Sequence, residues 1–153
     1  MTAPCGLPCF NCHYYLANEN EEIREAVSKD LELSGVPIET MLCEGCRNQR
    51  GILDSHKAFF NNSEACYVYK CTSDKKIDFC YQCSDFPCDL LHPCADRATV
   101  VPHNTKVFNL CLIKKMGVES WAKEKAATVL KTYFGKWFSL HPIVMNHPSK
   151  FKW

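Results

Sequence analysis

Cysteine is the residue type whose number and spacing point most directly to chemistry in this sequence. The 153-residue chain contains 12 cysteines, and ten of them lie in short groups. Loops of two to four residues let neighbouring thiolates converge on one metal ion without strain. We therefore predict metal binding for these ten residues, which are Cys5, Cys9, Cys12, Cys43, Cys46, Cys66, Cys71, Cys80, Cys83 and Cys88.

A disulfide framework is the other common use of an even cysteine count, and the sequence argues against it. The first residues lack the charged and apolar segments of a secretory signal. We therefore expect a cytoplasmic protein, whose thiols stay reduced. A membrane span is also not expected, since no apolar run approaches the roughly 20 residues that one requires.

Two kinds of metal centre fit the cysteine spacing. Zinc favours two pairs, so Cys9 and Cys12 would join Cys43 and Cys46 in one site. The triplet 80/83/88 would form a second site with Cys71 or His92. Iron–sulfur cubanes also take triplets, with a fourth ligand from elsewhere in the chain. The sequence has two triplets, 5/9/12 and 80/83/88, and the second is flanked by aromatic side chains that would exclude water, namely Phe79, Tyr81 and Phe86.

Other candidate chemistry is weaker. The triplet 5/9/12 has the spacing found in radical S-adenosylmethionine enzymes, but the alternating strands and helices of their barrel are missing from the pattern. A metal-dependent enzyme would need an open coordination position, which only this odd triplet allows. Enzymatic activity is therefore left open and is not the expectation. Cys94 has no clear assignment, and Cys111 is predicted to be a small buried residue of an apolar helix.

The elements that must position these cysteines are mostly helical. Apolar residues recur every four positions in the first segment, and glycines close the later ones. Between them, the stretch Met41–Cys94 shows little periodicity and is predicted to form irregular metal-binding loops with one short helical turn. The predicted helices are Asn18–Ser34 with a cap at Asn18, the turn Lys57–Phe60, Asn104–Met116 capped by Asn104, and Glu119–Phe134, with an apolar tail Trp137–Trp153 packing on the last two.

Charge divides the chain at the same place as the helical pattern. Residues 1–94 carry 8 Lys and Arg against 14 Asp and Glu, whereas residues 95–153 carry 10 against 3. We predict a cysteine-rich metal-binding module over 1–94 and a basic helical extension over 95–153 that packs on it. The expected fold is small, cysteine-rich, metal-stabilised and mostly α, with a C-terminal helical pair. Nucleic-acid binding is not expected, because Arg97 is the one arginine after Cys94.

The cysteine motifs resemble those of a prokaryotic family catalogued as domain of unknown function 3795. The resemblance is carried by Cys5-Gly6-Leu7-Pro8-Cys9-Phe10-Asn11-Cys12, Cys43-Glu44-Gly45-Cys46, Cys66-Tyr67-Val68-Tyr69-Lys70-Cys71 and Cys80-Tyr81-Gln82-Cys83-Ser84-Asp85-Phe86-Pro87-Cys88. The family usually carries another cysteine shortly before the position of Cys66, and residues 61–65 have none here. The frequency of the family in anaerobic bacteria and archaea implies iron–sulfur chemistry rather than zinc, and it supplies no reaction.

These observations predict an iron–sulfur protein with about two 4Fe–4S clusters. It would act as an electron carrier or as an accessory subunit of an anaerobic redox enzyme, with a protein as its redox partner. The alternative is a zinc-binding structural module that recognises protein or RNA. In the expected pairing, one site has Cys9, Cys12, Cys43 and Cys46, the other has Cys71, Cys80, Cys83 and Cys88, and Cys5 and Cys66 complete or adjoin them.

Overall fold

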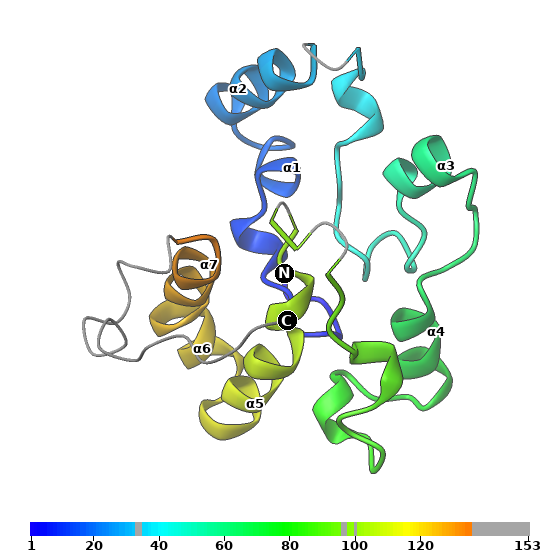
Figure 1. The fold of residues 1–153 in the computed structure, drawn as a ribbon, viewed down its shortest axis with the longest axis vertical. Coiled ribbons are helices and arrows are strands. Elements are labelled where there is room, and N and C mark those ends of the chain that lie inside the picture. The colour runs from blue at the N-terminus through cyan, green and yellow to red at the C-terminus, as the bar shows by residue number, and fades with distance from the viewer. Residues whose placement is uncertain (33–34, 96–97, 100, 136–153) are drawn as a thin grey trace, which may run out of the picture.

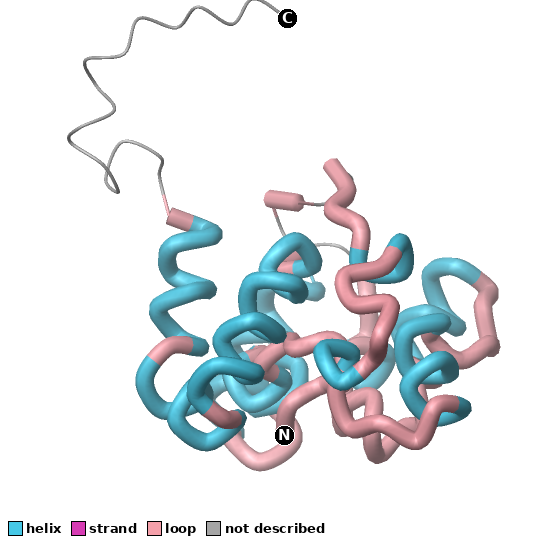
Figure 2. The backbone as a smooth tube through the Cα atoms, turned by 90° about the horizontal axis from the view of Figure 1, so that it is seen from below, coloured by secondary structure: helices cyan, strands magenta, loops and turns pink. Residues whose placement is uncertain are grey.

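The protein is mostly helical, as the sequence predicts. A computed structural model describes residues 1–32, 35–95, 98–99 and 101–135, and no strand occurs among them (Figures 1 and 2). Short 3-10 turns join the helices and hold several of the cysteines. The α-helices of the described residues are α1 (His13–Leu16), α2 (Glu21–Glu32), α3 (Asp54–Phe60), α4 (Tyr67–Asp74), α5 (Lys106–Met116), α6 (Val118–Glu124) and α7 (Ala126–Phe134).

The first predicted helix is present as α2, but its predicted cap is wrong. Asn20, not Asn18, accepts a hydrogen bond from the backbone N–H of Ile23 at 3.0 Å. Asn18 instead donates its side-chain amide to the carbonyl oxygens of Tyr15 and Cys43, both at 2.9 Å. The reason is that the short helix α1 precedes α2, and Asn18 closes α1 against the Cys43 loop.

The later helices follow the prediction with three differences. The segment predicted as Glu119–Phe134 is divided at Lys125 into α6 and α7. Asn104 does not cap α5, because its side chain makes hydrogen bonds to both the N–H and the C=O of Cys94. Helix α3 begins at Asp54 rather than Lys57. These boundaries depend on contacts between distant segments, which local periodicity does not encode.

Helix α4 lies in a stretch for which the sequence predicts irregular loops and no helix apart from the short turn Lys57–Phe60. It places one face against the core, with Val68 and Thr72 buried four residues apart. The Thr72 hydroxyl donates to the carbonyl oxygen of Val68 at 3.1 Å and so adds no unsatisfied polar group to this face. Two buried positions in eight residues give a weak periodic signal, which is why the loop prediction is wrong here.

The N-terminal segment runs through the middle of the molecule, with α5–α7 on one side and α3 and α4 on the other (Figure 1). Hydrogen bonds to backbone carbonyl groups of the N-terminal segment connect it to the rest of the chain. Arg47 joins two distant segments, since its Nε donates to the carbonyl oxygen of Thr2 at 2.8 Å and its Nη2 to that of Asp78 at 2.6 Å. The Cys80 N–H donates to the carbonyl oxygen of Pro4 at 3.0 Å.

The C-terminal helices pack directly on this segment. Leu110 of α5 is fully buried, and its Cγ lies 2.9 Å from the position that a Cβ on Gly6 would occupy. Trp121 of α6 is also fully buried and meets Phe10 edge to face, with ring centroids 5.9 Å apart. The tail Trp137–Trp153 lies outside the described residues, so its predicted packing stays a prediction. In the described part of the chain, none of the helices has the length and apolar character needed to cross a membrane.

Candidate metal centres

The ten predicted cysteines fall into two neighbouring groups in space. We call Cys5, Cys9, Cys12, Cys43, Cys46 and Cys66 the N-terminal group, because they surround the segment that contains the first triplet. The cavity group comprises Cys71, Cys80, Cys83 and Cys88, which line one cavity. The two groups meet where Cys5 and Cys80 lie in one buried apolar cluster with Val68 and Leu110.

Backbone hydrogen bonds centred on Gly51 hold part of the N-terminal group together. The Gly51 N–H donates to the carbonyl oxygen of Cys46 at 2.8 Å, and the Gly51 carbonyl accepts from the N–H of Cys66 at 2.9 Å. Gly51 has a φ of +79°, and a Cβ on it would lie 2.8 Å from the ring of Tyr69. Only glycine combines this backbone conformation with so close a neighbour, so this residue fixes the distance between the two cysteine segments.

The thiols of Cys9 and Cys46 contact each other within the N-terminal group. The hydrogen bond between them lowers the pKa of Cys9 and raises that of Cys46. Burial raises the pKa of Cys5 to about 11, although the Lys106 ammonium of α5 opposes this effect. Cys5, Cys9 and Cys46 share one apolar cluster, so the metal-free thiols pack as core side chains.

Cys12 and Cys43 lie at the α1 end of this group. The Cys43 N–H donates to the carbonyl oxygen of Tyr14 at 3.2 Å. Its sulfur accepts a hydrogen bond from the backbone N–H of Gly45 at 3.3 Å. Burial raises the pKa of Cys43, and negative charge on Cys12 or Cys9 raises it further. A backbone N–H aimed at a cysteine sulfur stabilises the thiolate form that binds metal.

The cavity group has a different environment. Its four cysteines line a cavity of about 270 Å³ whose other walls are largely apolar. Cys71 lies on α4, and the other three cysteines lie in the loop and short turns that follow this helix. Burial raises the pKa of Cys80 to about 12, with smaller contributions from charge on Cys5 and on the rest of the group. The apolar part of the wall is formed by Val68, Ile77, Phe86 and Leu90.

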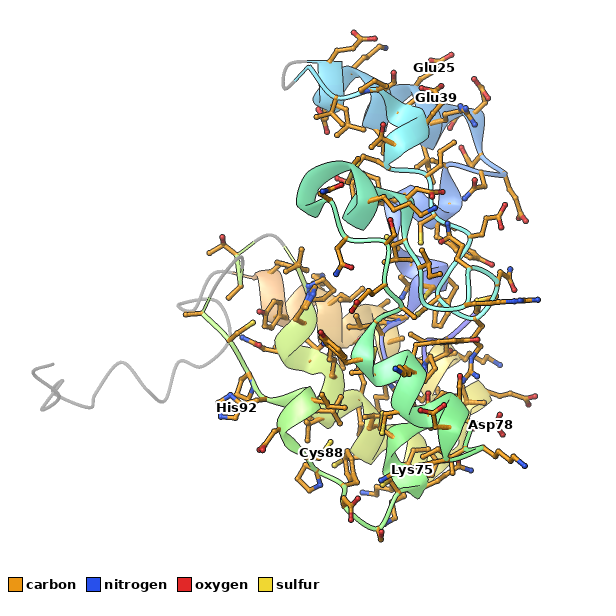
Figure 3. The ribbon with its side chains drawn as sticks, turned by 90° about the vertical axis from the view of Figure 1, so that its right-hand side faces the viewer. Glu25, Glu39, Lys75, Asp78, Cys88 and His92 are labelled. Carbon is orange, nitrogen blue, oxygen red and sulfur yellow. The ribbon has the colours of Figure 1, made fainter. Side chains whose placement is uncertain are left out.

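Figure 3 shows Cys88 of the cavity group and Lys75 toward one end of the molecule, whereas Glu25 of α2 and Glu39 lie at the opposite end. The predicted aromatic flank is present: Phe79 and Tyr81 stack with ring centroids 5.7 Å apart, and the Arg47 guanidinium lies 5.1 Å from the Phe79 centroid.

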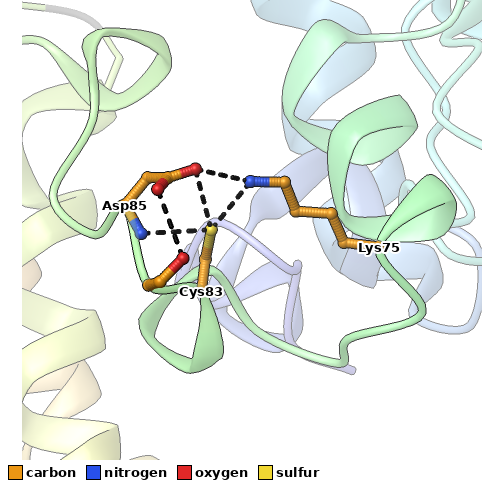
Figure 4. A network of polar contacts seen from close by, with 4 residues as sticks. Lys75, Cys83 and Asp85 are labelled. Carbon is orange, nitrogen blue, oxygen red and sulfur yellow. Dashed lines mark hydrogen bonds and ion pairs between the residues drawn. The ribbon is translucent and has the colours of Figure 1, made fainter.

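Polar groups meet the cavity group at Cys83 (Figure 4). The Lys75 ammonium lies 3.0 Å from the Cys83 sulfur and 2.8 Å from Oδ2 of Asp85. The backbone N–H of Asp85 also donates to this sulfur, at 3.4 Å. Hydrogen bonding to Asp85 raises the pKa of Lys75, and the same bond lowers the pKa of Asp85. The Cys83 sulfur therefore faces two donors, of which one carries a full positive charge.

The spacing of the side chains bears on the metal that the two groups could hold. In the described part of the chain, no three Cys, His, Asp or Glu side chains converge closely enough to coordinate one ion. A four-thiolate zinc site requires sulfurs about 4 Å apart, given zinc–sulfur bonds near 2.3 Å. The cavity group surrounds a space of about 270 Å³. Four thiols are the ligand number of a zinc ion and of a 4Fe–4S cluster alike.

The remaining candidates lie outside both groups. His92 is the sequence-based alternative to Cys71, but it is exposed and its Nδ1 lies 2.7 Å from the carbonyl oxygen of Pro93. The predicted burial of Cys111 is wrong, because this residue is exposed on α5. Lys75 is a site residue that the cysteine pattern does not reveal. Its position four residues after Cys71 at the end of a helix is the signal that both share a face.

Comparison with known proteins identifies one family. A family model described as "Protein of unknown function (DUF3795)" matches residues 1–93. This range contains all ten cysteines of the two groups. Neither the curated proteins nor the solved structures contain a match to this chain.

Proposed function

Since the chain belongs to the DUF3795 family of proteins of unknown function, we propose from its own geometry that it is an iron–sulfur protein that transfers electrons to a protein partner. The observation that carries this proposal is the cavity group. Four cysteines line one space with largely apolar walls. Cysteine thiolates in this number are the usual ligands of a 4Fe–4S cluster, which exchanges one electron at a time.

The surroundings of the cavity group suit that role. Apolar walls limit the access of water, and hydrogen bonds to a ligand sulfur adjust the reduction potential of a cluster. Both features are present here, in Phe86 and in the donors to Cys83. Asp85 and Lys75 beside Cys83 are exposed, so a partner that docks there would reach the cavity without passing through the core.

The N-terminal group would hold the second centre. Its six thiols give a choice of ligand sets around the Cys9–Cys46 contact. The shared apolar cluster of Cys5 and Cys80 would bring this centre close to the first one. Two neighbouring clusters provide a path along which electrons pass through the protein, which is the arrangement expected of a carrier or of an accessory subunit of an anaerobic redox enzyme.

The test is anaerobic purification followed by iron and sulfide analysis and a visible spectrum. We expect a brown protein with iron and labile sulfide in similar amounts, and with a broad absorption that dithionite bleaches. A colourless protein that contains zinc and no sulfide, prepared without exposure to air, would contradict the proposal.

Zinc binding by the N-terminal group is the second candidate. It is favoured by the contact between Cys9 and Cys46, since one zinc ion needs closely spaced sulfurs. The set Cys9, Cys12, Cys43 and Cys46 would then hold a structural ion, and the protein would act by binding protein or RNA. Analysis of zinc and iron in the same sample decides between one metal, the other, or one of each.

A further inference from the structure

Lys75 and Asp85 are placed by separate segments of the chain at the same cavity cysteine. Lys75 directly follows α4, which also carries Cys71, so the helix holds the lysine and a cavity thiol on one face. Asp85 follows Cys83 by two residues, and the turn between them aims the Asp85 backbone N–H at the sulfur. The side chains of Lys75 and Asp85 then meet at 2.8 Å beside that sulfur (Figure 4).

We propose that Lys75 and Asp85 are an opposed pair of positioning residues that set the charge balance, and hence the reduction potential, of the group held by the cavity cysteines. This inference rests on the proposed function, because it requires a metal centre in the cavity. It goes further in assigning the tuning to two exposed side chains of opposite sign. Neither residue is a metal ligand in this proposal, since each acts through the sulfur of Cys83.

The direction of each effect follows from charge. The Lys75 ammonium lies 3.0 Å from the sulfur and offsets the negative charge of a thiolate-bound centre. It therefore stabilises the reduced state, which carries one more electron, and raises the potential. The Asp85 carboxylate lies 3.7 Å from the same sulfur and pairs with the Lys75 ammonium. Its negative charge therefore destabilises the reduced state and lowers the potential.

The size of each effect is limited by solvent. The Lys75 and Asp85 side chains are 42% and 65% exposed, so their charges are partly screened. A hydrogen bond to a charged group contributes enough to change an equilibrium by about tenfold or more in a protected site. We therefore expect changes of up to about tenfold, which is ~59 mV for a one-electron couple, and we expect salt to reduce them.

The experiment compares three substitutions in the full chain. Lys75→Met removes the charge and the donor, whereas Asp85→Asn removes the opposing charge and keeps the backbone N–H. Lys70→Met is the matched control, because Lys70 is an exposed lysine on the same helix. After anaerobic reconstitution with iron and sulfide, spectroelectrochemistry measures the midpoint potential of each variant. We expect Lys75→Met to lower it, Asp85→Asn to raise it and Lys70→Met to leave it unchanged, while the conservative variant Lys75→Arg should keep the wild-type value.

Titration of each metal-free protein with Co²⁺ gives a second measurement that does not depend on cluster assembly. Loss of the Lys75 charge should weaken Co²⁺ binding by up to about tenfold, and loss of the Asp85 charge should strengthen it. Opposite shifts from two neighbouring substitutions are not expected from a general loss of structure, and circular dichroism checks that the fold is kept.

The possible failures are distinguishable. If the wild-type protein takes up neither iron with sulfide nor Co²⁺, the proposed function fails and this inference fails with it. If metal binds but Lys75→Met and Asp85→Asn behave like Lys70→Met in both measurements, the inference is wrong and the metal-binding proposal stands. Shifts of the same sign in both variants would also overturn it, because the two charges would then not be opposed.

Discussion

The two cysteine groups differ in how the chain packs around them. In the N-terminal group, Cys5 is buried and the thiols of Cys9 and Cys46 contact each other inside an apolar cluster. In the cavity group, four thiols line a space of about 270 Å³, and Cys83 makes polar contacts with exposed side chains. The thiols of the first group are packed in the core, whereas those of the second line an open space with a charged side chain at its edge.

Because of this difference, we expect substitutions in the N-terminal group to affect mainly the stability of the protein and substitutions in the cavity group to affect mainly the proposed metal binding. Removing the contacts of the N-terminal group would damage the core that α5 and the N-terminal segment share. Cys80 of the cavity group also belongs to this core, whereas removing Cys71 or Cys83 would remove a proposed ligand and leave the core cluster intact. The two groups are therefore expected to respond differently to substitution.

The largest effect is expected for Cys88→Ser in the cavity group. Cys88 lines the cavity, and a serine hydroxyl is a much poorer ligand of iron than a thiolate. Under the proposed function, iron per chain should fall by about half, because one of two centres is lost. The control is Cys111→Ser, which changes an exposed thiol of α5. Equal iron contents in the two variants would remove Cys88 from the ligand set.

Two leucine substitutions test whether the chain is packed more tightly around the N-terminal group than around the cavity group. Leu110 is fully buried beside the N-terminal group, whereas Leu90 lines the cavity and is 43% exposed. Leu110→Ala should lower the free energy of unfolding by about 2–5 kcal/mol. Leu90→Ala should cost less than about 1 kcal/mol, because much of its surface already meets water. Urea unfolding measures both, and similar losses would mean that the cavity wall is as well packed as the core.

Gly51→Ala probes the link between Cys46 and Cys66. The new methyl group would lie 2.8 Å from the Tyr69 ring, at a residue whose φ is +79°. We expect a loss of stability about 1–3 kcal/mol greater than that of Gly35→Ala. Gly35 also has a positive φ, of +67°, but no atom of the described residues beyond its chain neighbours lies within 4 Å of the methyl group that alanine would add there. If the two variants unfold at the same urea concentration, backbone conformation alone explains the glycine.

A smaller effect is expected from pH in the metal-free, reduced protein. Burial raises the pKa of Cys5 from 9.0 to about 11 and that of Cys80 from 9.0 to about 12. Above pH 9 the unfolded chain loses these protons while the folded chain keeps them, so stability falls as pH rises from 9 toward 11. Each thiol should cost about 1 kcal/mol by pH 10.

Urea unfolding between pH 8 and pH 10.5 measures this slope. Cys5→Ala should reduce the slope, with the contribution of Cys80 remaining, and Cys111→Ala should retain the wild-type dependence. A wild-type slope that Cys5→Ala does not change would show that the Cys5 thiol is not protected by burial as the structure indicates.

The helical character of the chain and the identity of the ten cysteines that lie close together are both predictable from the sequence. The four-residue recurrence of Ile23, Val27 and Leu31 is sufficient for α2, and Gly117 is sufficient for the end of α5. Such signals are local, because a helix forms its hydrogen bonds within a few residues of its own segment. The cysteine spacing likewise identifies the ten residues, since short loops keep neighbouring thiols together whatever the rest of the chain does.

Tertiary structure decided which thiols meet and what surrounds them. Arg47 ties the segment that contains Cys46 to Thr2, near Cys9, and Gly51 ties it to Cys66, so that cysteines far apart in sequence come together. Lys75 lies beside Cys83 because α4 and the following loop bring both to one cavity. Contacts of this kind depend on how whole segments pack, and no periodicity within either segment encodes them. The sequence by itself therefore determined which cysteines are close neighbours along the chain, and packing determined which of these groups lie together and which other side chains surround them.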